Sequence, residues 1–61
     1  GMSITECIQF TRINYSKHLL KYTQYSILEI ALESGFENQN YYATVFKKVT
    51  GYTPKAYRDH M

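Results

Sequence analysis

The chain has 61 residues, near the lower size limit for an independent domain, so a core and a catalytic cleft would compete for the same side chains. A composition that is 44% hydrophobic and 16% aromatic excludes a disordered tail, and a formal net charge of +2 does not by itself indicate a nucleic-acid partner. The single cysteine excludes an internal disulfide and fits a cytoplasmic protein, and no apolar run reaches the roughly 18 residues needed to span a membrane.

The first predicted helix covers residues 3–22 and opens with a capping box, Ser3 with Glu6. Gly1 and Met2 before it look like a tag remnant and a start methionine. At about 100° per residue, the apolar side chains of this helix fall on two roughly opposite faces. One face holds Ile4, Cys7, Ile8, Tyr15 and Leu19, and the other holds Phe10, Ile13 and Leu20. The chain can cover only one face comfortably, so we expect the second to pack against something outside these 61 residues.

Residues 26–50 predict two helices joined by a tight turn. Ser26 and Glu29 form a second capping box, followed by an apolar stripe of Ile27, Ile30 and Ala31. Gly35 is expected to end this helix in the left-handed conformation, with Phe36 folding back onto it. Asn38 is a good N-cap for a third helix from Gln39 to about Val49, whose inner face holds Tyr42, Val45, Phe46 and Val49.

A short fourth helix is predicted after Gly51. Thr53 is its N-cap and Pro54 its first residue, and we expect it to bury Ala56 and Tyr57. The predicted fold class is therefore all-α. Two helices around a glycine-containing turn, the second with a polar outer face, are the physical content of a helix-turn-helix, which indicates DNA binding.

The outward face of the third helix supplies the predicted contacts with DNA. Amide side chains near the helix start can pair with adenine, and a threonine can offer a weaker contact to thymine. The predicted base contacts are Gln39, Asn40, Ala43 and Thr44. Lysines, and backbone N–H groups at the start of the second helix, can neutralise or bind phosphates. The predicted phosphate contacts are Asn38, Tyr41, Lys47, Lys48 and Ser26.

Spaced groups of residues along nearly the whole chain resemble the second helix-turn-helix of the AraC/XylS regulators. These groups are Ser26-Ile27-Leu28-Glu29-Ile30-Ala31, Ser34-Gly35-Phe36, Tyr41-Tyr42, Phe46-Lys47-Lys48, Gly51-Tyr52-Thr53-Pro54 and Tyr57-Arg58. The first helix resembles that family's linker helix at Arg12-Ile13, Ser16, Leu19 and Leu20. Two positions depart from the family pattern, because Ser16 stands where Ala is usual and Thr44 where many members have Arg.

The resemblance implies a homeodomain-like helix-turn-helix bundle with a long N-terminal linker helix at residues 3–22. Residues 23–61 would form the second helix-turn-helix subdomain, with the motif at 26–50 and a short C-terminal helix. It implies double-stranded DNA as the partner, with the third helix in the major groove. It also implies that the chain is a fragment of a larger bacterial transcription regulator, whose first helix-turn-helix and effector or dimerisation domain lie elsewhere. RNA polymerase is a further expected partner, and a membrane is not.

Two other classes of function were weighed on the sequence. The two-faced first helix favours, as an alternative, a protein-interaction or dimerisation module. An enzyme is not expected, because the sequence offers no nucleophile–base pair, no metal-ligand spacing and no phosphate-binding glycine loop. We therefore expect no catalytic residue, metal or cofactor. Arg12 and Arg58 are expected to be structural, pairing with a carboxylate or a helix end.

Overall fold

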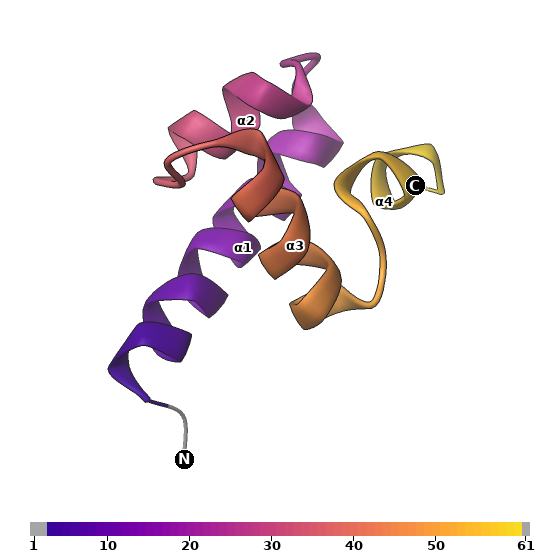
Figure 1. Cartoon of the computed structure of the whole chain (residues 1–61). Helices are drawn as coiled ribbons and strands as arrows, with labels where there is room; N and C mark the ends of the chain where they lie inside the picture. Colours follow the sequence, from indigo (N-terminus) through magenta and orange to yellow (C-terminus); the bar gives the residue numbers. More distant parts are fainter. Residues whose placement is uncertain (1–2, 61) are drawn as a thin grey trace.

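The computed structural model describes residues 3–60, and its regular structure there consists of helices, as predicted. They are α1 (Ile4–Tyr22), α2 (Ile27–Glu33), α3 (Gln39–Thr50) and α4 (Pro54–Asp59). Gly1 and Met2, with their interpretation as a tag remnant, lie outside the described residues. In Figure 1, α3 crosses in front of the middle of α1, α2 lies above it and α4 closes one side, while the first turns of α1 extend away from the other helices.

All four helices begin with the same hydrogen bond. The residue before each helix has an extended backbone, and its side-chain oxygen accepts a hydrogen bond from the backbone N–H three residues later. The pairs are Ser3 with Glu6 (3.1 Å), Ser26 with Glu29 (3.1 Å), Asn38 with Tyr41 (2.7 Å) and Thr53 with Ala56 (3.1 Å). Each bond satisfies an amide that has no partner inside its helix, so the predicted starts are confirmed.

The turn between α2 and α3 is a Schellman motif. The N–H of Phe36 donates to Ala31 O (2.9 Å) and that of Gly35 to Leu32 O (3.1 Å). Gly35 has φ +95° just after the end of α2, and the Phe36 side chain that follows it is buried. The predicted left-handed glycine and its apolar partner are confirmed. This turn determines the angle at which the chain enters α3.

The core lies where α1, α2 and α3 meet. Its buried apolar members are Ile13, Leu19, Leu20, Ile30, Ala31, Phe36, Tyr42, Val45 and Phe46. Aromatic rings run through it in edge-on or tilted contact, with centroids 5.2 Å apart for Phe36 and Tyr42 and 5.7 Å for Tyr42 and Phe46. Such ring pairs add to the free energy gained from burying apolar area.

The structure covers mainly one of the two predicted faces of the first helix, and Leu19 is the residue of the other face that is also buried. The buried side chains of α1 are Ile13, Ser16, Leu19 and Leu20, which mix members of both predicted faces. Leu19 and Leu20 are both buried because the covered side of the helix is centred between them. The other predicted apolar residues, Ile4, Cys7, Ile8, Phe10 and Tyr15, are exposed because they precede or point away from the crossing with α3. In α4, the expected burial is only partial, since Ala56 and Tyr57 are half-buried and Pro54 is buried.

Two buried side chains, those of Ser34 and Tyr42, keep an unpaired oxygen among the described residues. The Tyr42 hydroxyl is fully buried and makes no hydrogen bond within the described residues. Burial raises the pKa of this phenol above its usual 10, and the nearby Ser16 hydroxyl and Arg58 charge lower it without cancelling the effect. Ser16 donates its own proton to Ile13 O (2.7 Å), so this serine is satisfied inside α1. A buried hydroxyl without a partner lowers stability.

Among the described residues, no helix combines the length and the apolar character needed to cross a bilayer.

Candidate nucleic-acid interface

The outer side of α3 is the surface on which most of the predicted contacts meet. Tyr42, Val45 and Phe46 turn inward, which leaves the opposite side of the helix facing solvent. The exposed members of the predicted set on this helix are Gln39, Asn40, Tyr41, Thr44, Lys47 and Lys48. The packing of the core therefore determines which residues α3 presents.

The beginning of α3 presents amides beside an unneutralised helix end. Asn38 uses its side-chain oxygen on the Tyr41 N–H, so its cap role is fixed. Gln39 and Asn40 follow as exposed residues, and the first turn of α3 holds no acidic side chain. The partial positive charge of this helix end is therefore available to an anion.

The middle of α3 is less polar. Ala43 is half-buried, and the Thr44 hydroxyl donates to Asn40 O at 3.0 Å. Because that proton is used inside the helix, Thr44 offers a partner its methyl group and an acceptor oxygen rather than a donor. This part of the helix is suited to an apolar contact.

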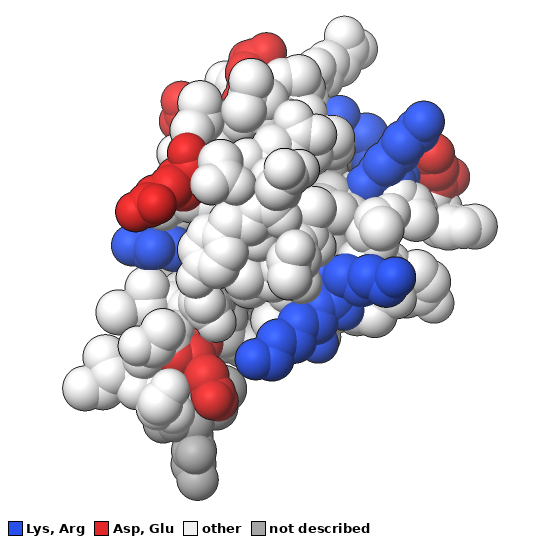
Figure 2. All heavy atoms as spheres, in the orientation of Figure 1, with Lys and Arg blue, Asp and Glu red and all other residues white. Residues whose placement is uncertain are grey.

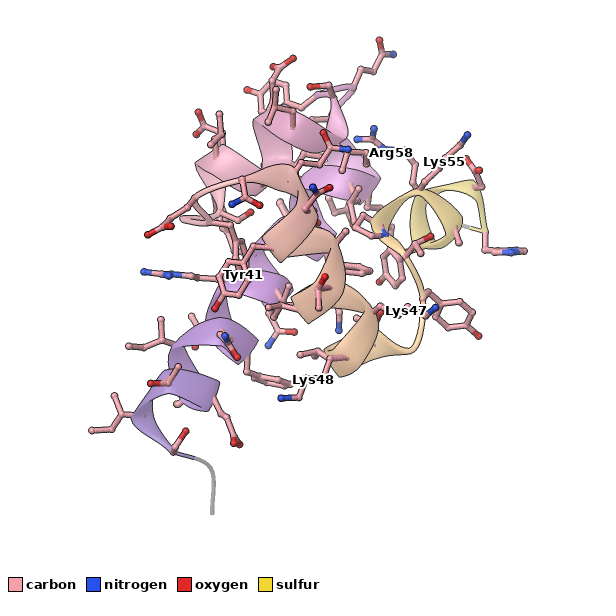
Figure 3. All side chains as sticks on the ribbon, in the orientation of Figure 1. Tyr41, Lys47, Lys48, Lys55 and Arg58 are labelled. Atoms are coloured by element: carbon pink, nitrogen blue, oxygen red, sulfur yellow. The ribbon has the colours of Figure 1, made fainter. Side chains whose placement is uncertain are left out.

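The end of α3 carries the basic charge. Lys47 and Lys48 are exposed in its last turn. Figure 2 shows Lys and Arg side chains gathered over the C-terminal half of α3 and over α4, with acidic groups over α2 and the start of α1. Lys55 of α4 lies on the basic side in Figure 3 but was not among the predicted contacts. Its place in the acid-free basic stretch 47–58 was the signal that could have found it.

Ser26 belongs to a different helix from the rest of the set. Its hydroxyl accepts the Glu29 N–H (3.1 Å) and donates to the Glu29 carboxylate (3.2 Å). The acidic side chain thus occupies the start of α2, where an approaching phosphate would meet a like charge. Only the backbone of Ser26 remains suited to the predicted contact.

Tyr41 is tied to α1 by a contact that the sequence did not predict. Its hydroxyl accepts a hydrogen bond from Gln9 Nε2 at 2.6 Å, and its ring stands edge-on to Phe36 with centroids 5.7 Å apart. Gln9 and Tyr41 are 32 positions apart, and no local pattern links them. The side chain is therefore held from two sides.

Arg58 is structural, as expected. Its guanidinium donates to the carbonyls of Leu20 (3.3 Å), Thr23 (3.4 Å) and Tyr25 (2.8 Å), which join α4 to the end of α1 and the following loop. Arg12 lies against the α2–α3 turn, where its Nε would be 2.9 Å from a Cβ added to Gly35. Arg58 therefore supports the frame around α3, and Arg12 lies beside the turn that enters it.

Known proteins share both this sequence pattern and this fold. A family model described as "Helix-turn-helix domain" matches residues 1–60. The HTH-type transcriptional activator RhaR of Salmonella arizonae is 38% identical over 58 residues, which are 95% of this chain and 21% of RhaR.

Two solved structures superpose closely. The C-terminal domain of AraT, a response regulator from Geobacillus stearothermophilus, gives a TM-score of 0.96 at 34% identity over 100% of this chain and 50% of that one. The C-terminal domain of the response regulator yesN from Fusobacterium nucleatum gives 0.90 at 40% identity, over 95% and 56%. The chain thus spans about a fifth of RhaR and about half of each solved domain.

Proposed function

Because this chain belongs to the AraC-type helix-turn-helix family of bacterial transcription regulators, a family of DNA-binding domains and not of enzymes, we propose that it binds double-stranded DNA with α3 in the major groove. The observation that carries this placement is the outer side of α3. It combines exposed amides at the start of the helix with exposed lysines at its end. Base edges and phosphates are recognised by these two kinds of group.

In this proposal the contacts divide along α3. Gln39 and Asn40 read base edges through their amides, and Ala43 and Thr44 supply apolar contact with a thymine methyl group. Lys47 and Lys48 neutralise phosphates, and Asn38, Tyr41 and the backbone of Ser26 add hydrogen bonds to the DNA backbone. A few lysines give only modest affinity, so binding in the cell needs a second linked module.

The linked module is part of the same proposal. Residues 3–22 act as the linker helix and residues 23–61 as the second helix-turn-helix subdomain of a regulator. The solved relatives support this division, since this chain matches only about half of each C-terminal domain. The remaining proposed partners are a first helix-turn-helix, an effector or dimerisation domain of the same protein, and RNA polymerase.

Fluorescence anisotropy tests the placement of α3. Replacing Gln39 and Asn40 with Ala should relax the base preference, because their amides no longer pair with base edges. Lys47→Ala should reduce the slope of log K against log salt by about one unit while leaving the preference unchanged. Lys21→Ala is the matched control. Lys21 is also an exposed lysine, but it lies in the last turn of α1 and not on α3, with its Nζ 5.2 Å from the centre of the Tyr22 ring. An unchanged preference or slope would remove the corresponding contact.

A second function is favoured by one observation. Ile4 and Ile8 are 81% and 45% exposed on one face of the first turns of α1, which is an apolar surface suited to a protein contact. The occupant that we propose is another segment of the same regulator, and in the isolated chain a second copy can take its place. Sedimentation of this chain should then show self-association at high concentration that Ile8→Ser weakens. A monomer at all concentrations would argue against this contact.

A further inference from the structure

Gln9 stands out in the first turns of α1. Within residues 4–12 it is the one residue that is not exposed. Its Nε2 donates to the Tyr41 hydroxyl at 2.6 Å, and it lines a hollow of about 170 Å³ together with Lys48 of α3. The amide therefore contacts the same flank of α3 on which two predicted phosphate contacts, Tyr41 and Lys48, lie seven residues apart (Figure 3).

The direction of the hydrogen bond determines what the Tyr41 hydroxyl can still do. A phenol has one O–H to donate and an oxygen that accepts. Since Gln9 donates, the oxygen is used as an acceptor and its proton remains available, directed away from the amide. The ring cannot easily turn, because Phe36 meets it edge-on on another side, yet Tyr41 is still 44% exposed.

We propose that Gln9 is a positioning residue for DNA binding: by donating to the Tyr41 hydroxyl, it orients the hydroxyl proton toward a phosphate oxygen of the bound duplex. A hydroxyl held in advance loses less conformational freedom when it binds. The bond to a charged oxygen is also stronger than one to a neutral acceptor. Through this contact α1, which carries no predicted DNA contact, acts on the DNA-binding surface of α3. The inference rests on the proposed placement of α3.

A double-mutant cycle tests this role, using the complete 61-residue chain and a fluorescently labelled 20-base-pair duplex of random sequence at low salt. Phosphate contacts do not depend on sequence, so no operator is needed. Tyr41→Phe should weaken binding about five- to tenfold, the loss expected for one hydrogen bond at a solvent-exposed site. Gln9→Met should weaken it about two- to fourfold, because the hydroxyl remains but is no longer oriented. In the Tyr41→Phe background, Gln9→Met should have no further effect.

Two results would overturn the proposal. An equal loss from Gln9→Met in both backgrounds would mean that Gln9 acts on DNA directly or through the fold. Unchanged affinity for Tyr41→Phe would remove the phosphate contact. If Lys47→Ala still reduces the salt slope in that case, the placement of α3 survives and only this inference fails. If Lys47→Ala also leaves the salt slope unchanged, both the placement of α3 and this inference fail.

Thermal unfolding separates positioning from a structural role. Gln9→Met should lower the melting temperature of the chain by no more than about 4 °C, because Gln9 is only half-buried and loses one hydrogen bond. If this variant does not fold, Gln9→Glu replaces it. A carboxylate at position 9 can only accept a hydrogen bond from the Tyr41 hydroxyl, whereas the Gln9 amide donates one to it. The repulsion between this carboxylate and DNA is present in both Tyr41 backgrounds and cancels in the cycle. An excess loss confined to the Tyr41 background supports the proposal, and equal losses contradict it.

Discussion

The helix α3 and the first half of α1, residues 4–12, both carry large apolar side chains, yet only α3 buries most of them. Tyr42 and Phe46 of α3 are 0% exposed, whereas Ile4 and Phe10 of α1 are 81% and 42% exposed. The difference does not come from residue type. It comes from what lies opposite: α3 packs against α1, α2 and α4, and the first turns of α1 extend beyond them (Figure 1).

The boundary between these two conditions falls inside one continuous helix. Up to Arg12, α1 has no buried residue, and from Ile13 onward it contributes four to the core. The first half is therefore held mainly by its cap, by its own backbone hydrogen bonds and by the bond from Gln9 to Tyr41, whereas the second half is held by packing. Variants on the two sides of this boundary should respond differently.

The largest expected contrast is between two phenylalanines. Phe46→Ala should cost about 3–5 kcal/mol of unfolding free energy, because it opens a cavity among rings that cannot close it. Such a loss is enough to unfold a chain of this size. Phe10→Ala should change the unfolding free energy by less than about 0.5 kcal/mol. Urea denaturation followed by circular dichroism measures both, and similar losses would show that the first half of α1 is packed after all.

A smaller effect tests whether residues 4–12 carry any of the stability. Gly35→Ala should cost about 1–3 kcal/mol, since φ +95° strains any residue with a Cβ and the new atom would meet Arg12 of α1. Gly51→Ala is the matched control, because Gly51 has φ +84° with no neighbour within 4 Å of a new Cβ. Thermal melts compare the two. A larger loss at Gly35 reports the contact with α1, and equal losses would reduce the effect to backbone strain alone.

The smallest expected effect lies at the centre of the packed side. Tyr42→Phe removes a buried hydroxyl that has no partner, so the unfolding free energy should rise by about 0–1 kcal/mol at neutral pH. The folded pKa of Tyr42 is raised by burial. The stability linked to this proton is therefore complete below pH 10 and is lost as the pH rises through the folded pKa.

Melts between pH 9 and pH 12 check that sign. The parent chain should lose stability above about pH 10, the usual phenol pKa, more steeply than Tyr42→Phe does. Tyr52→Phe, which removes an exposed hydroxyl, is the control and should keep the parent's steeper loss. Parallel profiles for the parent and Tyr42→Phe would contradict the burial effect.

The features that the sequence predicted well are those determined within a few residues. The caps Ser3, Ser26, Asn38 and Thr53 and the turn at Gly35 depend only on neighbours in the chain, and all are confirmed. The inner face of α3 follows from periodicity, except that Val49 is only partly buried. From that face follows the exposure of its outer residues, although whether they contact DNA stays a prediction.

The features that it could not predict depend on where distant segments meet. The buried side of α1 was not predicted, because periodicity alone cannot say where along a long helix its partners cross. The bond between Gln9 and Tyr41 joins positions 32 apart, and the contacts of Arg58 reach back 33 to 38 positions. Neither pairing has a local signal in one sequence.

The three carbonyls held by Arg58 have a consequence for the order in which the protein is made. They belong to Leu20, Thr23 and Tyr25, which leave the ribosome before the residue that binds them. During synthesis, the end of α1 and the loop before α2 therefore lack these three hydrogen bonds until α4 has emerged. We expect this domain to complete its folding only once nearly all of it has been translated, so that a nascent chain stopped before Arg58 stays incompletely folded.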